Sequence, residues 1–319
     1  MKRHQKILIA ILAVQLVVSV ILLWPKSVAT GSSEPVFTKF TADDIVSLDI
    51  TDDQNVSIVL EKKNGEWVLP AAGDYPVKVD TVTPILENLV KLDKTTLVAQ
   101  TEASHKQLQV SKTDFQRRII IRTDGKGDYV LYLGSAPRYT ATNFRVEGQS
   151  EVYQTPLLSS WELNTRANMW VDTAYVTTDQ TTISQVILEN AQGTVTLVKD
   201  GENWTLSDLQ EGEEVSLGKV NALVRNASTV TLMTPLGTSP EPEYGMDAPL
   251  AKVTLVTADG TRTLQVGARN TADSTYVVKS SESPYYVRVA EYNIKAMVED
   301  ARQAFLVEPE SETESETAP

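Results

Sequence analysis

Two histidines and a surplus of carboxylates are the groups in this sequence that suit metal binding or nucleophilic catalysis. A zinc site needs several His, Cys or carboxylate ligands at short spacings. The chain has no cysteine, and His4 and His105 stand far apart in it. A Ser-His-Asp arrangement would have to use His105, without a Gly-x-Ser-x-Gly motif to present the serine. We therefore predict no metal ligands and single out no catalytic residue.

The polar segment from Asp52 to Asn55 offers oxygen atoms of the kind that calcium prefers. The same residue types favour tight turns, because their side chains bond to their own backbone. The segment separates two β-rich stretches, so a hairpin turn is the favoured interpretation. Glycine-rich motifs for holding phosphates, GxxxxGK[ST] and GxGxxG, do not occur. No cofactor is therefore expected.

Acidic residues outnumber basic ones by 42 to 29. Nucleic acids bind basic surfaces, so this excess argues against a nucleic-acid partner. Pairs of carboxylates can hydrolyse glycosidic bonds. With 42 acidic residues the sequence cannot select one such pair.

Aromatic residues at corresponding positions of an internal repeat are the remaining candidates. Trp67 corresponds to Trp204, and Tyr153 corresponds to Tyr286. Tyr285 is an additional tyrosine that the first copy lacks. Two interpretations are open for these five residues, namely packing inside each copy or a surface that binds a partner.

These aromatic residues lie in segments that recur along the sequence. LEKKNGEWVL at 60–69 aligns with LVKDGENWTL at 197–206. Other segments follow in the same order, for example VLYLG at 130–134 with TLQVG at 263–267, which places Gly134 on Gly267. Several matches in one order are hard to obtain by chance. They indicate two copies of one structural unit.

Each copy, over 37–174 and 175–307, combines hairpins with helices. Asn-Gly and Asp-Gly pairs before the tryptophans predict hairpin turns. Apolar residues recur at helical spacing from Val82 to Leu92 and from Val220 to Ala227. Hairpins interspersed with helices, without βαβ alternation, predict an α+β fold. We thus expect two tandem repeats of an antiparallel sheet unit with packed helices.

A further helix is expected at the end of each copy, near 156–168 and 290–304. Trp161 lies in the first of these segments and Trp170 just after it. We interpret both tryptophans as packing between the copies.

An apolar segment at 7–24, ILIAILAVQLVVSVILLW, precedes the copies and is long enough to span a bilayer as a helix. Basic residues within 1–6 place that end in the cytoplasm and the remainder outside. We expect a single-pass protein of the cell membrane that contacts the lipid bilayer through 7–24. Cleavage after Ala29, as in a signal peptide, is the alternative. We expect residues 25–36 to form a linker and the acidic residues 308–319 to form a disordered tail.

Three motifs of the second copy resemble those of a known family. They are Tyr-Gly-Met-Asp-Ala-Pro at 244–249, Leu-Gln-Val-Gly at 264–267 and Tyr-Val-Val at 276–278. With the membrane span and the strand–turn–Trp order, they make the chain similar to the bacterial domain of unknown function 4340 family. The resemblance implies membrane-anchored envelope proteins, often encoded beside ABC transport components of the gliding-motility type. It implies no catalytic residues.

These observations together predict a non-enzymatic accessory or interaction protein outside the cytoplasmic membrane. The expected partner is an envelope protein, for example a component of an ABC-type transport or surface-assembly system. A hydrolase acting on cell-wall polymer and a solute-binding module are the alternatives.

Overall fold

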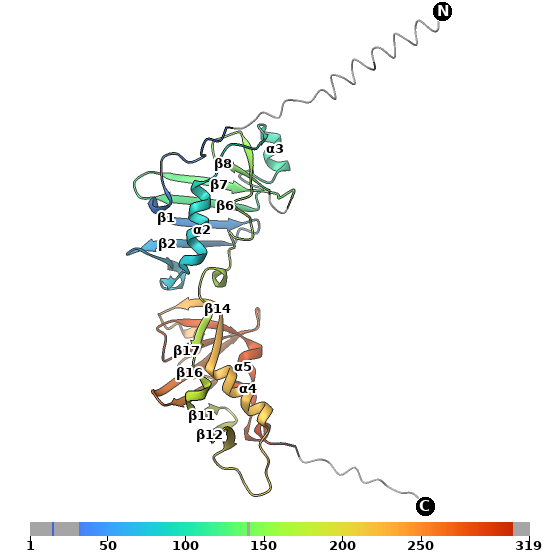
Figure 1. Cartoon of the computed structure of the whole chain (residues 1–319). Coiled ribbons are helices and arrows are strands. Elements are labelled where there is room, and N and C mark those ends of the chain that lie inside the picture. Colours follow the sequence, from blue (N-terminus) through green and yellow to red (C-terminus); the bar gives the residue numbers. More distant parts are fainter. Residues whose placement is uncertain (1–14, 16–31, 139–140, 309–319) are drawn as a thin grey trace, which may run out of the picture. The chain divides into compact units, whose positions relative to one another are not determined.

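The computed structural model describes residues 15, 32–138 and 141–308 (Figure 1). Apart from Gln15, the expected membrane span at 7–24 lies outside these residues, as do Ala29 and nearly all of the acidic tail. Within the described ranges, no helix has both the length and the apolar character needed to cross a bilayer.

Two nine-stranded antiparallel sheets with a few helices make up the described chain. The expectation of an α+β fold built on antiparallel sheets is therefore confirmed. The strands of the first sheet are β1 (Ile45–Asp52), β2 (Ser57–Lys63), β3 (Glu66–Leu69), β4 (Tyr75–Pro76), β5 (Leu97–Ala99), β6 (Arg117–Thr123), β7 (Asp128–Leu133), β8 (Thr142–Val146) and β9 (Val152–Thr155). Their spatial order is β4-β3-β2-β1-β6-β7-β8-β9-β5.

The second sheet follows largely the same chain path. Its strands are β10 (Ala174–Thr177), β11 (Ile183–Asn190), β12 (Gly193–Asp200), β13 (Asn203–Leu206), β14 (Thr229–Gly237), β15 (Ala251–Thr257), β16 (Gly260–Asn270), β17 (Thr275–Ser280) and β18 (Tyr286–Ala290), in the order β10-β14-β18-β17-β16-β15-β11-β12-β13. In each sheet a three-stranded meander (β1–β3 or β11–β13) is followed by a helix and then by a strand on the far side of the sheet (β5 or β14). A four-stranded meander fills the space between them. The edge strands β4, beside β3, and β10, beside β14, have no counterpart in the other sheet.

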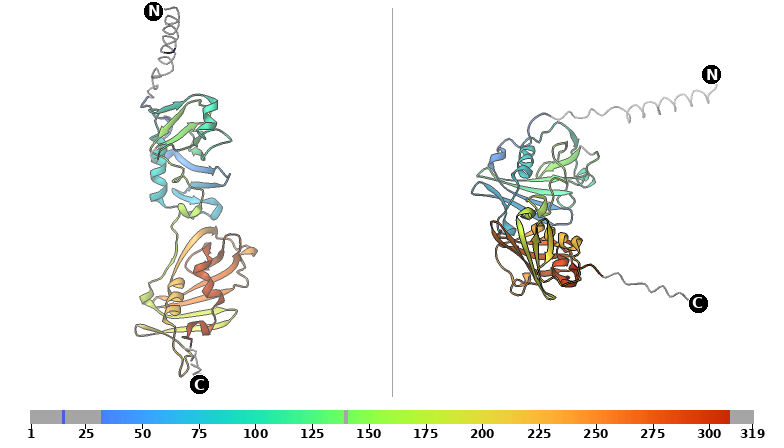
Figure 2. Two further views of the ribbon diagram at one scale, coloured as in Figure 1. Left: turned by 90° about the vertical axis from the view of Figure 1, so that its right-hand side faces the viewer. Right: turned by 60° about the horizontal axis from the view of Figure 1, so that its bottom comes forward.

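Helix α2 (Val79–Val90) lies against one face of the first sheet (Figures 1 and 2). It buries Val82, Leu86 and Leu89, whose spacing of three and four residues gives the helix one apolar face. In the second sheet α4 (Leu217–Ser228) contacts α5 (Glu291–Glu299), and α5 packs on four strands of that sheet. The two helices predicted from apolar spacing are thus confirmed as α2 and α4. A short helix, α3 (Glu102–Gln107), precedes β6.

The predicted turns have the backbone conformations that their residues favour. Asn64 and Gly65 both have positive φ, 52° and 90°, as a two-residue hairpin between β2 and β3 requires. Asp52 begins a turn, because its Oδ1 accepts hydrogen bonds from the backbone N–H of Gln54 and of Val56. The turn interpretation of this acidic segment is confirmed.

The helix expected near 156–168 is absent, and that prediction is wrong. Bends, a turn and irregular backbone occupy residues 156–166, followed by a short 3-10 helix, Ala167–Met169. Side-chain bonds to the backbone compete with a helix here, as where Asn164 Oδ1 accepts the N–H of Arg166 at 2.9 Å. The helix expected near 290–304 is divided into α5 and a 3-10 turn, Arg302–Phe305.

Candidate functional site

A polar hollow of about 670 Å³ opens beside α3 and the end of β8. Its ionisable lining residues are Glu102, His105, Lys106, Lys112, Arg145 and Glu147. Three of these side chains are basic and two are acidic, so the hollow has a small excess of positive charge in a strongly acidic chain.

A small apolar cluster forms the base on which the hollow is built. Val110, Phe115, Tyr132 and Val152 bury their side chains against one another. Val110, in the loop after α3, is a member of this cluster, and its N–H donates to the carbonyl of His105 in α3 at 2.8 Å. This arrangement holds the carbonyl of Val110 beside β8.

Arg145 is the most deeply buried charged residue of the hollow, with 5% of its surface exposed. Its Nε donates to the carbonyl of Val110 at 2.7 Å and its Nη1 donates to that of Gln149 at 3.2 Å. The guanidinium lies over the ring of Tyr132, 4.8 Å from the centroid. Burial lowers the pKa of Arg145, although the group stays charged at neutral pH.

Lys112 and Glu147 form an ion pair of 2.6 Å at the rim of the hollow. Glu147 raises the pKa of Lys112, while the positive charge of Arg145 acts in the opposite direction. His105 is buried, and its Nε2 lies 2.8 Å from the carbonyl of Ser150. The hollow is therefore preorganised by hydrogen bonds to backbone carbonyls, and its charged groups suit recognition of a polar ligand.

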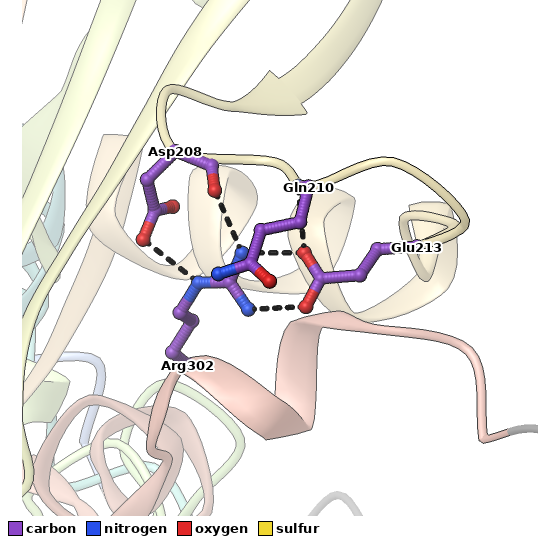
Figure 3. A network of polar contacts seen from close by, with 4 residues as sticks. All are labelled: Asp208, Gln210, Glu213 and Arg302. Carbon is purple, nitrogen blue, oxygen red and sulfur yellow. Dashed lines mark hydrogen bonds and ion pairs between the residues drawn. The ribbon is translucent and has the colours of Figure 1, made fainter.

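A second polar network, in the other sheet's unit, surrounds Arg302 (Figure 3). Its guanidinium donates to both carboxylate oxygens of Glu213, at 2.8 and 2.6 Å, and to Asp208 at 2.8 Å. The N–H of Gln210 also donates to Glu213, at 2.9 Å. These bonds lower the pKa of Glu213 to about 2, with Arg302 as the largest cause. Every carboxylate of this network is engaged by a protein group, which is the pattern of a structural clamp.

Three of the five aromatic residues singled out in the sequence are buried within their own sheets. Trp67 in β3, Trp204 in β13 and Tyr153 in β9 are 7%, 8% and 8% exposed. Tyr285 and Tyr286 are half-buried at the start of β18. The five residues do not gather at one site within either sheet. Their suggested role as an interaction surface stays a prediction.

Trp161 is an exposed aromatic residue that the sequence reasoning assigned to packing. Its side chain is 70% exposed, whereas Trp170 is fully buried, and the expected packing of these tryptophans between the copies stays a prediction. Ser159 and Glu162 lock the turn that carries Trp161, since the Ser159 hydroxyl donates to Glu162 Oε2 at 2.6 Å. A Ser-x-x-Glu pattern is the local signal that predicts such a turn.

The comparison with family models gives one match. The model described as "Domain of unknown function (DUF4340)" matches residues 67–236, which is more than half of the chain. No curated protein and no solved structure matches the sequence.

Proposed function

The chain belongs to the family of the domain of unknown function 4340, and on that premise we propose that it is a membrane-anchored, extracytoplasmic accessory protein. It acts by binding another protein of the cell envelope and carries out no catalysis. The family resemblance suggests components of an ABC-type transport or surface-assembly system as the partner.

The observation that carries this proposal is the exposure of Trp161. Large apolar side chains are costly to leave in water, and tryptophan is enriched among the residues that dominate protein interfaces. The side chain is 70% exposed and stands on a turn fixed by Ser159 and Glu162. A rigid, exposed tryptophan loses little entropy when it binds, because its position is set beforehand.

Three carboxylates have pKa values shifted in the direction that does not suit the acid of a glycoside hydrolase. Asp44, Asp179 and Glu213 have lowered pKa values in the described chain. The main causes are hydrogen bonds from Lys126, from a threonine hydroxyl and from Arg302, respectively. A general acid in glycoside hydrolysis needs a raised pKa. These carboxylates instead stabilise ion pairs and turns.

The anchor and the duplication are part of the same proposal. The apolar segment 7–24 supports a membrane span that holds the folded units close to the outer face of the membrane. The common chain path of the two sheets, together with the aligned sequence segments, supports two copies of one unit over 37–174 and 175–307.

Site-specific photo-crosslinking tests the proposal. A photoreactive amino acid replaces Trp161 in the full-length chain, in native membranes, and replaces exposed Lys39 in the control. We expect a reproducible adduct with one envelope protein from position 161 and none from position 39. Absence of any adduct from a folded, membrane-bound chain would overturn the proposal. So would hydrolysis of wall polymer by the purified chain.

A further inference from the structure

We propose that the hollow beside α3 binds a small carboxylate ligand, with Arg145 and Lys112 as its recognition groups. This inference concerns a different surface from Trp161 and does not depend on the proposed function.

The first argument is the missing counter-ion of Arg145. A buried cation is costly unless an anion or several acceptors compensate it. Arg145 is 5% exposed and forms no direct ion pair in the described ranges; the carboxylate of Glu147, which is paired with Lys112, acts on it only through its charge. Backbone carbonyls and the ring of Tyr132 give only partial compensation. An anionic ligand in the hollow would complete it.

The second argument is that one nitrogen of the Arg145 guanidinium, Nη2, can donate a hydrogen bond to a ligand. Its Nε and Nη1 donate to protein carbonyls, whereas Nη2 has no hydrogen bond to any described residue. Nη2 is also not among the buried atoms of the described chain that lack a partner, so solvent reaches it. Because Arg145 lines the hollow, this donor can meet a ligand there.

The charges of the hollow favour a carboxylate over a doubly charged phosphate. Lys106, Lys112 and Arg145 supply three positive charges, and Glu102 and Glu147 supply two negative ones. The net charge is therefore one positive unit, which matches a single carboxylate. A dianion would meet repulsion from both glutamates. The volume, about 670 Å³, suits a small molecule.

Lys112 would contribute a second contact to the bound carboxylate. Lys112 pairs with Glu147 at 2.6 Å and is close enough to Arg145 for the two positive charges to repel. A carboxylate bound by both cations would relieve that repulsion. We expect the guanidinium to provide most of the affinity, because it is preorganised, and Lys112 to add a weaker, more solvated contact.

Ligand-observed NMR on the full-length chain tests the proposal. The probes are N-acetylalanine, N-acetylglycine, the uncharged N-acetylglycinamide and inorganic phosphate. We expect both carboxylates to bind and the amide not to bind. Equal binding of the amide, or binding of phosphate but not of the carboxylates, would overturn the proposal.

Three variants locate the binding site. Arg145→Lys keeps the charge but loses the planar donor pair, and we expect it to weaken binding about tenfold. Lys112→Ala, at an exposed rim position, is expected to weaken binding about threefold without affecting the fold. Lys39→Ala removes an equal charge outside the hollow and should leave binding unchanged. If a folded Lys112→Ala protein, checked by thermal unfolding, binds the carboxylates as tightly as the Lys39→Ala control, the assignment fails.

Discussion

Arg302 and Glu213 form a two-point ion pair in which Nη1 donates to Oε1 at 2.8 Å and Nη2 donates to Oε2 at 2.6 Å. Parallel charge-assisted bonds of this kind are among the strongest between side chains. The pair joins the 3-10 turn after α5 to the loop between β13 and α4 (Figure 3). Backbone bonds reinforce the connection, since the N–H of Ser216 donates to Phe305 and that of Val307 donates to Glu214.

The ion pair predicts a loss of stability in acid. The folded state lowers the pKa of Glu213 from 4.5 to about 2. Its contribution is complete above the unfolded pKa and is lost as the pH falls from 4.5 towards 2. Urea denaturation at pH 7 and pH 3 should show a larger loss for the native chain than for Glu213→Gln. Equal losses in the two proteins would contradict the assignment.

Replacing Arg302 by alanine should release the segment that follows it. The substitution leaves Asp208 and Glu213 without their guanidinium partner, so residues 303–307 should open more often. We expect amide hydrogen exchange of this segment to become about tenfold faster, the scale of one charged hydrogen bond. The control is Lys295→Ala, which removes an exposed pair with Glu299 at 3.8 Å and should change little. Unchanged exchange in Arg302→Ala would mean that backbone bonds alone hold the segment.

Local patterns in the sequence were sufficient to predict much of the fold. Apolar residues at helical spacing located α2 and α4, and the Asn64-Gly65 pair located a hairpin. These features depend on neighbouring residues, which is why they can be read from a single chain. The expected helix at 156–168 failed because capping bonds from Ser159 and Asn164 stabilise turns there.

The hollow could not be predicted, because its geometry depends on distant parts of the chain. Arg145 bonds to the carbonyl of Val110, 35 residues earlier, and stacks on Tyr132 in the neighbouring strand. One local signal was present in the sequence. A basic residue stands between Phe144 and Val146, in a strand whose residues are all buried. A charge in such a position needs a compensating site.

The aligned glycines Gly134 and Gly267 should be intolerant of any side chain. A Cβ at Gly134 would lie 2.0 Å from the carbonyl oxygen of Leu108, and one at Gly267 would lie 2.0 Å from that of Tyr244. Because the clash is with backbone, we expect Gly134→Ala and Gly267→Ala each to destabilise the fold by about 1–3 kcal/mol in urea denaturation.

Gly218, in α4, provides the matched control for these two glycines. A Cβ at Gly218 has no neighbouring atom within 4 Å, and the helical backbone accepts alanine. Gly218→Ala should therefore be neutral or more stable by up to about 1 kcal/mol. If all three alanine variants behaved alike, the close backbone approaches would not explain why glycine occupies the aligned positions.

Alanine substitutions of Trp67 and Trp161 should affect stability differently, because Trp67 is buried and Trp161 is exposed. Trp67 is 7% exposed, so Trp67→Ala should remove about 3–5 kcal/mol from the free energy of unfolding. Trp161 is 70% exposed, and Trp161→Ala should change that free energy by less than about 0.5 kcal/mol. Urea denaturation of both variants provides the measurement. The same Trp161→Ala protein should lose its envelope partner in co-purification from membranes, although it is folded. If it were instead strongly destabilised, Trp161 would be a packing residue, and the proposed binding role would lose its main support.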